Sequence, residues 1–499
     1  LESEGQTDIR DLIQKKRALS KKEQDKINQD LINFIVDDIQ PFNILENKFF
    51  RHFVSSLNPN YEIPSQPKVD QLIEFAYHNT NQKLTKLIDS ADVEYVSLTC
   101  DFWTSRGCHG YIGVTCSFLS EDFEFNEILL ALQHVPYPHT AETINNKLQD
   151  VIFKWNLKNK VFTLTTDNGA NMVKAVRLLN YDLNIIRIPC FAHTLQLVVN
   201  KALKINTNIQ SFVLRCKRLI NFFTTPKQKE NLEKMQKELS YPNIHTVIQD
   251  ISTRWNSSFY SWRRLIDLQS AVTHLPSKLM ADLNKDNKKD GKRLERIMLN
   301  DSEWILMNDL VQIFSGFEEL TRKFSGKSYV TFSVVYPLIN SLKEKLNLIL
   351  NSIEDCNNIN ISINQNDESS EMMQMDEEDD SLLNIEVIPD EEEADELIVA
   401  VPGSKKKINI SRPIDTNGLK VHILKNLLLS IDKYWDLPSD LSFISSSLDP
   451  RLKKLNHLSS TQRENIKLLL QEEYQLLKNN QQESSQSQNN SQNLNEDDH

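Results

Sequence analysis

The order of the secondary-structure signals restricts this chain to a small set of folds. Three consecutive segments, "VEYVSLTCDFW", "YIGVTCSFLS" and "FNEILLALQHV", are short, rich in β-branched and aromatic residues, and separated by turn-like links. A helical segment follows, then "KVFTLTT", a helix, "NIIRIPC" and a further helix. Three strands that precede alternating helices and strands predict a mixed α/β fold, in which helices cover one sheet.

Composition and periodicity divide the rest of the chain into helical and low-complexity parts. Helical spacing without strand signals dominates after about residue 205, whereas one segment is acidic, rich in Asn and Ser, and almost free of aromatic residues. Such a composition predicts disorder. The predicted parts are an N-terminal helical region (1–92), the sheet-containing core (93–205), a helical domain (206–350), a disordered acidic linker (351–407), a helical continuation (408–480) and a disordered tail (481–499).

The formal net charge of −12 is unevenly distributed along the chain. Residues 351–400 contain 17 acidic residues and no Lys or Arg, and residues 481–499 contain four more acidic residues. Without these 21 negative charges the remainder carries a net charge of +9. A basic body is compatible with a phosphate-backbone partner. Charge alone favours the simpler interpretation, a solvated surface with a modest excess of cations.

Hydrophobic content and cysteine usage exclude some classes of protein. Hydrophobic residues make up 39% of the chain, and no uninterrupted apolar run reaches the ~18 residues that span a bilayer, so no membrane partner is expected. The six cysteines are scattered without a C-x-x-C pair, which favours a reducing, intracellular setting. The chain begins at Leu1 rather than Met, so we expect its natural N-terminus to lie upstream.

Two carboxylates at strand ends form the strongest candidate site. Alternation along the first strand places Asp101 and Trp103 on one face, at the strand's far end. Asp167 follows the fourth strand in the same way. If the two strands are neighbours, both carboxylates approach one point and require a bridging cation such as Mg²⁺. Either residue alone is more often structural, because Asp-Asn-Gly is ordinary turn chemistry.

Two further motifs each permit a functional and a structural interpretation. Cys190 and His193 have half of a zinc-site spacing, but no second ligand pair accompanies them, so a structural zinc site is not favoured. Arg254 and Trp255 suit contact with a phosphate and an unstacked base. An amphipathic helix that packs Trp255 and Trp262 into a core explains the same pattern, and periodicity favours that interpretation.

The ordered set of motifs resembles a known family. "LNPNYEIPS", "LTCDFWTS", "LTTDNGANMVKA", "CFAHTLQLVV", "DISTRWNSS", "FEELTRKFSGKSYVTFSVVYPLI" and "SLDPRLKKL" occur in this order. The chain resembles a hAT-superfamily transposase of the BED zinc-finger type, or a domesticated relative, over residues 38–350 and 410–460. The resemblance implies an RNase H-like core interrupted by a large all-α insertion domain. It also implies DNA at transposon ends as partner and a nuclear location.

The resemblance assigns roles to the residues already singled out. It implies that Asp101 and Asp167 are catalytic and bind a divalent metal, Mg²⁺ or Mn²⁺, for phosphoryl transfer during transposition. It implies DNA contacts for Trp103, His193, Arg254 and Trp255. The set of motifs is incomplete, however, because the "S-x-E-R-x-F-S" segment that carries the family's third catalytic carboxylate does not follow "SLDPRLKKL".

Two regions of the resembled family are therefore expected outside this chain. The zinc-binding BED finger that reads DNA would lie upstream of Leu1, and the region for self-association would lie beyond residue 499. Two hypotheses follow: a fragment of an active transposase, or a catalytically inactive derivative that binds DNA or chromatin in the nucleus.

Overall fold

The computed structural model describes residues 19–478, apart from 91–92, 106, 121, 251–254, 327–328, 330, 359–397, 401–406, 411, 436–439, 473 and 476–477. The chain divides into two compact units. The first comprises the described residues up to Tyr95 with Leu119–Glu124 and Ile152–Lys160, and the second comprises the rest. Within the described residues, no helix is both long and apolar enough to cross a membrane.

The first unit is helical, as its sequence predicts. Ser20 and Glu23 form a reciprocal capping box that starts the first helix, and Asn47 caps the third element by accepting hydrogen bonds from two backbone amides. A small core joins Leu31, Leu45 and Val69. The elements are α2 (Lys21–Asp37), the 3₁₀ helix η1 (Phe42–Glu46), α3 (Lys48–Leu57) and α4 (Gln66–Asp89).

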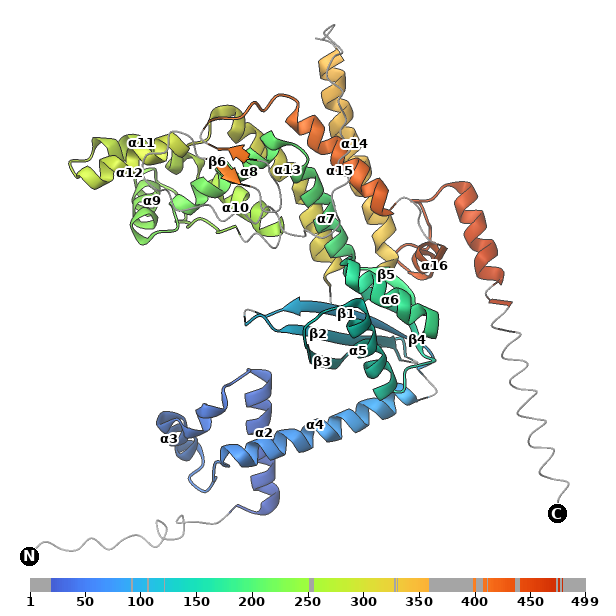
Figure 1. Cartoon of the computed structure of the whole chain (residues 1–499). Helices are drawn as coiled ribbons and strands as arrows, with labels where there is room; N and C mark the ends of the chain where they lie inside the picture. The colour runs from blue at the N-terminus through green and yellow to red at the C-terminus, as the bar shows by residue number, and fades with distance from the viewer. Residues whose placement is uncertain are drawn as a thin grey trace, which may run out of the picture. The chain divides into compact units, whose positions relative to one another are not determined.

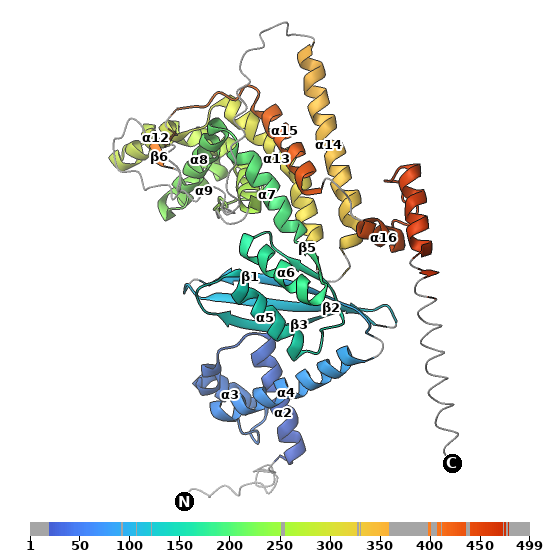
Figure 2. The ribbon, with the colours of Figure 1, turned by 45° about the vertical axis from the view of Figure 1, so that its right-hand side comes forward.

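The second unit begins with the predicted mixed sheet of five strands, in the order β3-β2-β1-β4-β5. β1 pairs antiparallel with β2 and parallel with β4, and β4 pairs parallel with β5. Helices α5 and α6 lie against one face of the sheet (Figures 1 and 2). The elements are β1 (Val96–Thr104), β2 (Gly110–Leu119), β3 (Phe125–Val135), α5 (Ala141–Lys154), β4 (Val161–Thr166), α6 (Ala170–Leu183) and β5 (Ile186–Pro189).

Burial along β1 follows the predicted alternation. Leu98 and Cys100 are at most 2% exposed, whereas Thr99 and Asp101 are exposed. Side chains of successive strand residues point to opposite faces, so one face of β1 is packed and the other faces solvent. We call the second face the open face of the sheet. It carries the carboxylate of Asp101 and the indole of Trp103.

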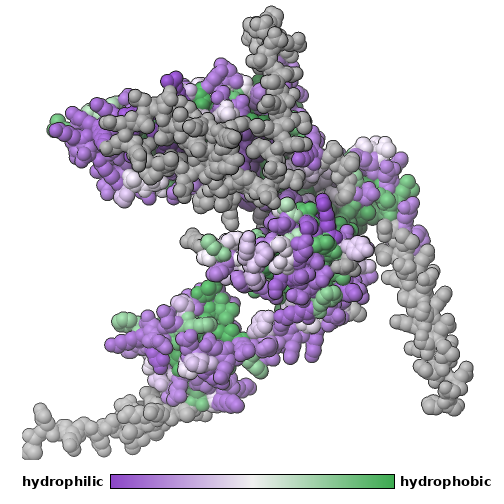
Figure 3. All heavy atoms as spheres, viewed as in Figure 1, coloured by the Kyte–Doolittle hydropathy of each residue, from purple (hydrophilic) through white to green (hydrophobic). Residues whose placement is uncertain are grey.

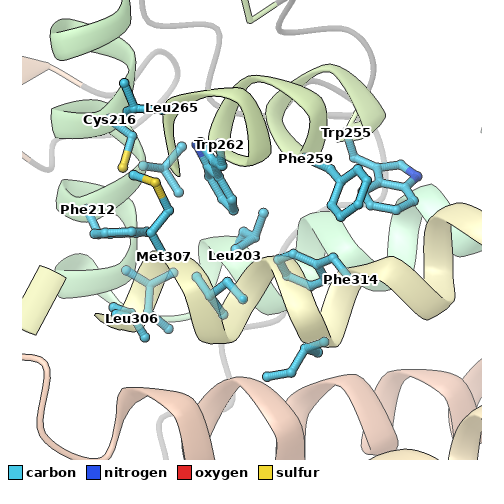
Figure 4. Close-up of a cluster of buried hydrophobic side chains, with 14 of the residues drawn as sticks. Leu203, Phe212, Cys216, Trp255, Phe259, Trp262, Leu265, Leu306, Met307 and Phe314 are labelled. Atoms are coloured by element: carbon cyan, nitrogen blue, oxygen red, sulfur yellow. The ribbon is translucent and has the colours of Figure 1, made fainter. Parts of the chain in front are cut away.

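A large helical domain follows β5, and its core is the largest of the molecule's described hydrophobic clusters. Phe212, Trp262, Met307 and Phe314 are among its buried side chains (Figure 4). The elements are α7 (Phe191–Lys204), α8 (Thr207–Phe222), α9 (Pro226–Glu238), α10 (Trp255–Asp267), α11 (Gln269–Ala281), α12 (Lys285–Ile297), α13 (Asp301–Phe324), α14 (Phe332–Asn358), β6 (Ile398–Ala400), β7 (Lys407–Asn409), α15 (Leu419–Trp435) and α16 (Asp440–Leu448).

A buried ion pair fastens the returning chain to this domain. The Arg215 guanidinium donates to Glu303 at 2.8 and 3.1 Å and to the carbonyl of Ile410 at 3.0 Å. The amide of Ile414 donates to the same carboxylate at 3.2 Å. Such a pair is stable only when its remaining hydrogen-bonding groups are satisfied, which these backbone contacts achieve. Residues on both sides of the acidic linker therefore belong to one folded domain.

Regular secondary structure extends into both ends of the linker that the sequence predicts to be disordered (351–407). α14 continues through Asn358, and β6 pairs antiparallel with β7. The composition gave no sign of these short strands, because an acidic stretch of low complexity surrounds them. Residues 359–397 and 401–406, like the predicted tail (481–499), lie outside the described residues.

Candidate functional site

The two candidate metal ligands lie at neighbouring strand ends. β1 and β4 pair in parallel, with Thr99 opposite Thr165. Each aspartate lies two residues further along the chain, Asp101 within β1 and Asp167 directly after the end of β4. Neighbouring strands are about 4.8 Å apart, and residues paired in register point to the same face. The fold thus provides two adjacent carboxylates, one exposed and one half-buried.

Both carboxylates contribute to the raised pKa values of two cysteine thiols. Burial is the main cause that raises the pKa of the Cys100 thiol, and the charges of Asp101 and Asp167 raise it further. Burial also raises the pKa of Cys190, again with contributions from both carboxylates, although backbone amides at the start of α7 oppose the shift. A negative charge raises a thiol pKa only at short range. Both thiols therefore lie within electrostatic range of the two carboxylates.

A hydrogen-bonded turn fixes the position of Asp167. The backbone amide of Gly169 donates to its Oδ1 at 3.1 Å. Arg187 on β5 donates through Nε to the hydroxyl of Thr166 at 2.9 Å, and through Nη2 to the carbonyl of Asp167 and the side chain of Asn168. A charged donor that binds several acceptors in one turn restricts its conformation. The carboxylate of Asp167 is therefore held at the strand end.

The same network reaches α7 and includes residues that sequence reasoning missed. Asn168 donates to Thr194 at 3.1 Å, and Thr194 donates to the carbonyl of Cys190 at 2.9 Å. Arg187 is a charged residue within an apolar strand segment, and this mismatch is the signal that could have revealed it. These three residues explain why the Asp-Asn-Gly turn is more than a link between elements.

A hollow of about 290 Å³ opens beside Asp167. Phe102 and Ile144 supply apolar walls, whereas Asn168 and Asn171 supply amide groups at its edge. Asp167 therefore borders the hollow directly, whereas Asp101 is not among the residues that line it.

Trp103 lies on the open face next to Asp101. Its side chain is 39% exposed, and its ring is nearly parallel to that of Tyr111, with 5.9 Å between centroids. Gly113 pairs with Asp101 across the strands, and an added Cβ there would lie 3.2 Å from the Trp103 ring. The missing side chain at Gly113 lets the indole lie close to the sheet.

The remaining candidates are placed differently from one another. His193 is half-buried in the first turn of α7, and Cys190, just before that helix, is a free thiol. Arg254 lies outside the described residues. Trp255 is 3% exposed and packs against Phe259, Phe314 and Phe317, with centroid distances of 6.1–6.4 Å.

The packing interpretation of Trp255 and Trp262 is therefore confirmed (Figure 4). A contact between Trp255 and DNA would require its ring to leave the core. The preceding Asp250 anchors this segment, because it accepts hydrogen bonds from Ser257 and Ser258 at 2.8 Å each and pairs with buried Lys217 at 3.4 Å. We call the contacts of Asp250 with Ser257, Ser258 and Lys217 the structural clamp of the motif "DISTRWNSS".

The donor set at the sheet edge suits one kind of metal. Among the described residues, no group of three or more His, Cys, Asp or Glu side chains could hold an ion. Mg²⁺ nevertheless keeps several waters and is commonly bound by one or two carboxylates together with substrate phosphates. Asp101 and Asp167 therefore fit a hard cation whose coordination shell is completed by oxygens of the substrate. They do not fit a closed zinc site, which needs about four ligands.

Two family models match consecutive parts of the chain. The ZBED1 RNase-like domain matches residues 99–188, and the ZBED1 RNase-like helical domain matches residues 188–312. The boundary falls within β5, just before the sheet gives way to the helices. The two models therefore divide the chain as the structure does.

Curated proteins from plants, fungi and animals are similar to this chain. The "Putative AC transposase" of Zea mays is 27% identical over 319 residues, which cover 61% of this chain and 37% of that protein. The human "Zinc finger BED domain-containing protein 4" is 23% identical over 336 residues, 65% of this chain and 27% of that protein. The "Putative transcriptional regulator tpeD" of Talaromyces stipitatus is 27% identical over 362 residues, 63% of this chain and 40% of that protein.

These matches span between 27% and 40% of the relatives' own lengths. The matched region contains the sheet, the two strand-end carboxylates and most of the helical domain. Its mixed five-stranded sheet and helical insertion are the RNase H-like architecture that the motifs predict. Over its RNase-like and helical domains, the chain is similar to hAT transposases and to their BED-type relatives.

Proposed function

We propose that this chain is the catalytic part of a hAT transposase, which cleaves and transfers DNA strands at transposon ends in the nucleus. The observation that carries the proposal is the parallel register of β1 and β4, which pairs Thr99 with Thr165, two residues before each aspartate. Enzymes that transfer phosphoryl groups between oxygens use such paired carboxylates to hold divalent cations at the reacting phosphate.

The residues at the sheet edge have separate roles in this proposal. Asp101 and Asp167 would hold Mg²⁺ or Mn²⁺, which supplies charge neutralisation at the phosphate and a more acidic bound water when present. Arg187 and Asn168 keep Asp167 in position through the turn that they fasten. Trp103 offers an exposed ring for a base that leaves the duplex.

A basic stripe on α12 supports DNA as the partner. The helix carries six cations, Lys285, Lys288, Lys289, Lys292, Arg293 and Arg296, all of them exposed. They lie on the side opposite the buried Gly291, Leu294 and Ile297, and hydrophilic residues cover the region of α11 and α12 in Figure 3. A row of cations along one helix face suits contact with a phosphate backbone. We call these six residues the basic stripe.

Calorimetry with Mn²⁺ tests the metal site. We expect heat of binding for the wild-type chain and little or none for Asp167→Ala. Asp150→Asn is the matched control, because it removes an exposed carboxylate from α5 without touching the site. Equal heats for the wild type and Asp167→Ala would overturn the proposal.

A second candidate function is DNA binding without cleavage, as in a domesticated transposase. Two observations favour it: among the described residues no third carboxylate joins Asp101 and Asp167, and one relative's printed name is that of a transcriptional regulator. Nicking of labelled duplex DNA in Mn²⁺ separates the two candidates. Nicking that disappears in Asp101→Asn supports the enzyme, whereas duplex binding without any nicking supports the second candidate.

A further inference from the structure

Four rings form a continuous row across β1, β2 and β3. Trp103 and Tyr111 are directly opposite in the β1–β2 register, with ring planes 21° apart. Tyr111 contacts His134 of β3 at 5.7 Å between centroids, and His134 contacts His109 at 5.5 Å. We call these residues the ring row. It starts beside Asp101 and leads away from the paired carboxylates.

Short side chains of β1 and β2 lie on the same face as the ring row, namely Ser97, Thr99, Gly113, Thr115 and Ser117. Two exposed leucines, Leu119 on β2 and Leu132 on β3, follow the same alternation. His109 and His134 are exposed, and Tyr111 is half-buried between its neighbours. Because most of the neighbouring side chains are short, the rings stand at the surface of a shallow face and not at the bottom of a cavity.

We propose that the ring row binds single-stranded DNA by stacking with successive unpaired bases. This inference rests on the proposed function and specifies the form of the strand at the site: unpaired beside Asp101 and extending over β2 towards β3. The Trp103 and Tyr111 rings are nearly parallel, whereas the two histidine contacts are edge-to-face, so the rings offer stacking partners in different orientations. Exposed rings suit bases whose own faces are free, and every base has such a face. In duplex DNA the base faces are already stacked on one another, so duplex DNA gains little from these rings.

Stabilisation of the sheet is the competing explanation for the same rings. Cross-strand aromatic pairs contribute to sheet stability wherever they occur. That explanation accounts for the Trp103–Tyr111 pair, but it does not require a third and a fourth ring that are exposed on β3 and in the β1–β2 turn. The two explanations differ in one measurable respect: only the stacking site distinguishes single-stranded from duplex DNA.

Fluorescence anisotropy with a labelled oligothymidine and with a duplex of equal length tests the proposal. EDTA is present throughout, so a failure of metal binding at Asp101 and Asp167 cannot change the result. We expect Tyr111→Ala to weaken single-strand binding by at least about fivefold, in line with the loss of one base stack, and to change duplex binding by less than about twofold. Tyr111→Phe keeps the ring, so it should retain single-strand affinity.

Two further variants keep the test decisive if Tyr111→Ala fails to fold. His134→Ala removes an exposed ring from the edge strand β3, where the cost in stability is small, and it should weaken single-strand binding in the same selective way. Tyr181→Ala is the matched control, because it removes a tyrosine that is 92% exposed on α6, outside the ring row. Equal affinities for His134→Ala and Tyr181→Ala, or equal losses for single-stranded and duplex DNA, would overturn the proposal.

Discussion

Trp103 and Trp255 have similar places in their motifs and opposite places in the fold. Each lies close to a charged residue, Asp101 in one case and Arg254 in the other. The Trp103 side chain is 39% exposed on an open sheet face, whereas that of Trp255 is 3% exposed within the helical core. A tryptophan beside a charge is therefore not by itself a mark of a binding surface.

The periodicity around each tryptophan accounts for the difference. Trp103 ends a strand in which alternate residues point outwards, so the indole shares the open face with Asp101. Trp255 begins a helix in which Phe259 and Trp262 follow on the same apolar side. Local periodicity thus separates a residue that can meet a ligand from one that builds the scaffold.

Truncation of the two tryptophans should give the largest contrast. Trp255→Ala leaves a cavity in a packed core and should cost about 3–5 kcal/mol in the free energy of unfolding. Trp103→Ala removes a partly exposed ring and should cost less than about 1 kcal/mol. Denaturant unfolding followed by circular dichroism measures both. Similar losses in the free energy of unfolding for the two variants would contradict the contrast between an exposed and a buried tryptophan.

Removal of the clamp before α10 should have the next largest effect. Asp250→Ala leaves Lys217 and two serine hydroxyls without their shared acceptor, which should cost about 2–3 kcal/mol. Denaturant unfolding measures the loss. Asp267→Ala, at the exposed end of the same helix, is the control and should stay within about 0.5 kcal/mol of the wild type. A loss as small as that of the control would show that the motif is not a structural clamp.

Neutralisation of the basic stripe should change salt dependence more than stability. Lys288→Gln combined with Lys292→Gln removes two cations, so the slope of log affinity for duplex DNA against log salt should fall by about two. Binding titrations at several salt concentrations measure the slope. Lys345→Gln, which removes an exposed cation from α14, is the control. An equal slope for the double variant and the control would show that α12 does not contact DNA.

Acid should reveal a smaller stabilising contribution in the "SLDPRLKKL" motif. Hydrogen bonds from Arg451, with a further one from Ser333, hold the pKa of Asp449 well below its usual range. A carboxylate with a depressed pKa in the folded state stabilises that state above its unfolded pKa of ~3.9, and the stabilisation is lost as the pH falls further.

Thermal unfolding of the wild type and Asp449→Asn across pH 6 to pH 3 tests this contribution. The wild type should be more stable near neutral pH, and the difference should narrow below about pH 4, where the carboxylate of the unfolded chain becomes protonated while that of the folded chain stays ionised. A difference that stays constant over the whole range would contradict the role of the carboxylate charge.

Local signals in the sequence are sufficient for much of the fold. Alternation in β1 predicts the faces of Asp101 and Trp103. Thr140 lies just before α5, and its hydroxyl accepts a hydrogen bond from the amide of Thr143 at 3.2 Å. Both features depend on residues a few positions apart. The sequence predicts that the two aspartates are close together only on the condition that β1 and β4 are neighbours.

Contacts between distant segments could not be predicted in this way. The register of β4 against β1, the binding of Arg187 to the Asp167 turn, and the pairing of Arg215 with Glu303 depend on how separate elements pack. The chain from Ile410 onwards returns to the helical domain across almost 200 residues, beyond the reach of any local pattern. Packing decides which of several plausible roles each motif residue takes.

The most direct test of the central claim is the Mn²⁺ dissociation constant, measured by electron paramagnetic resonance for Asp101→Asn, Asp167→Asn and the double variant. Two carboxylates that share one cation act as a unit, so each single variant should lose nearly as much affinity as the double variant. Losses that simply add, or a wild-type dissociation constant in either single variant, would contradict a shared site.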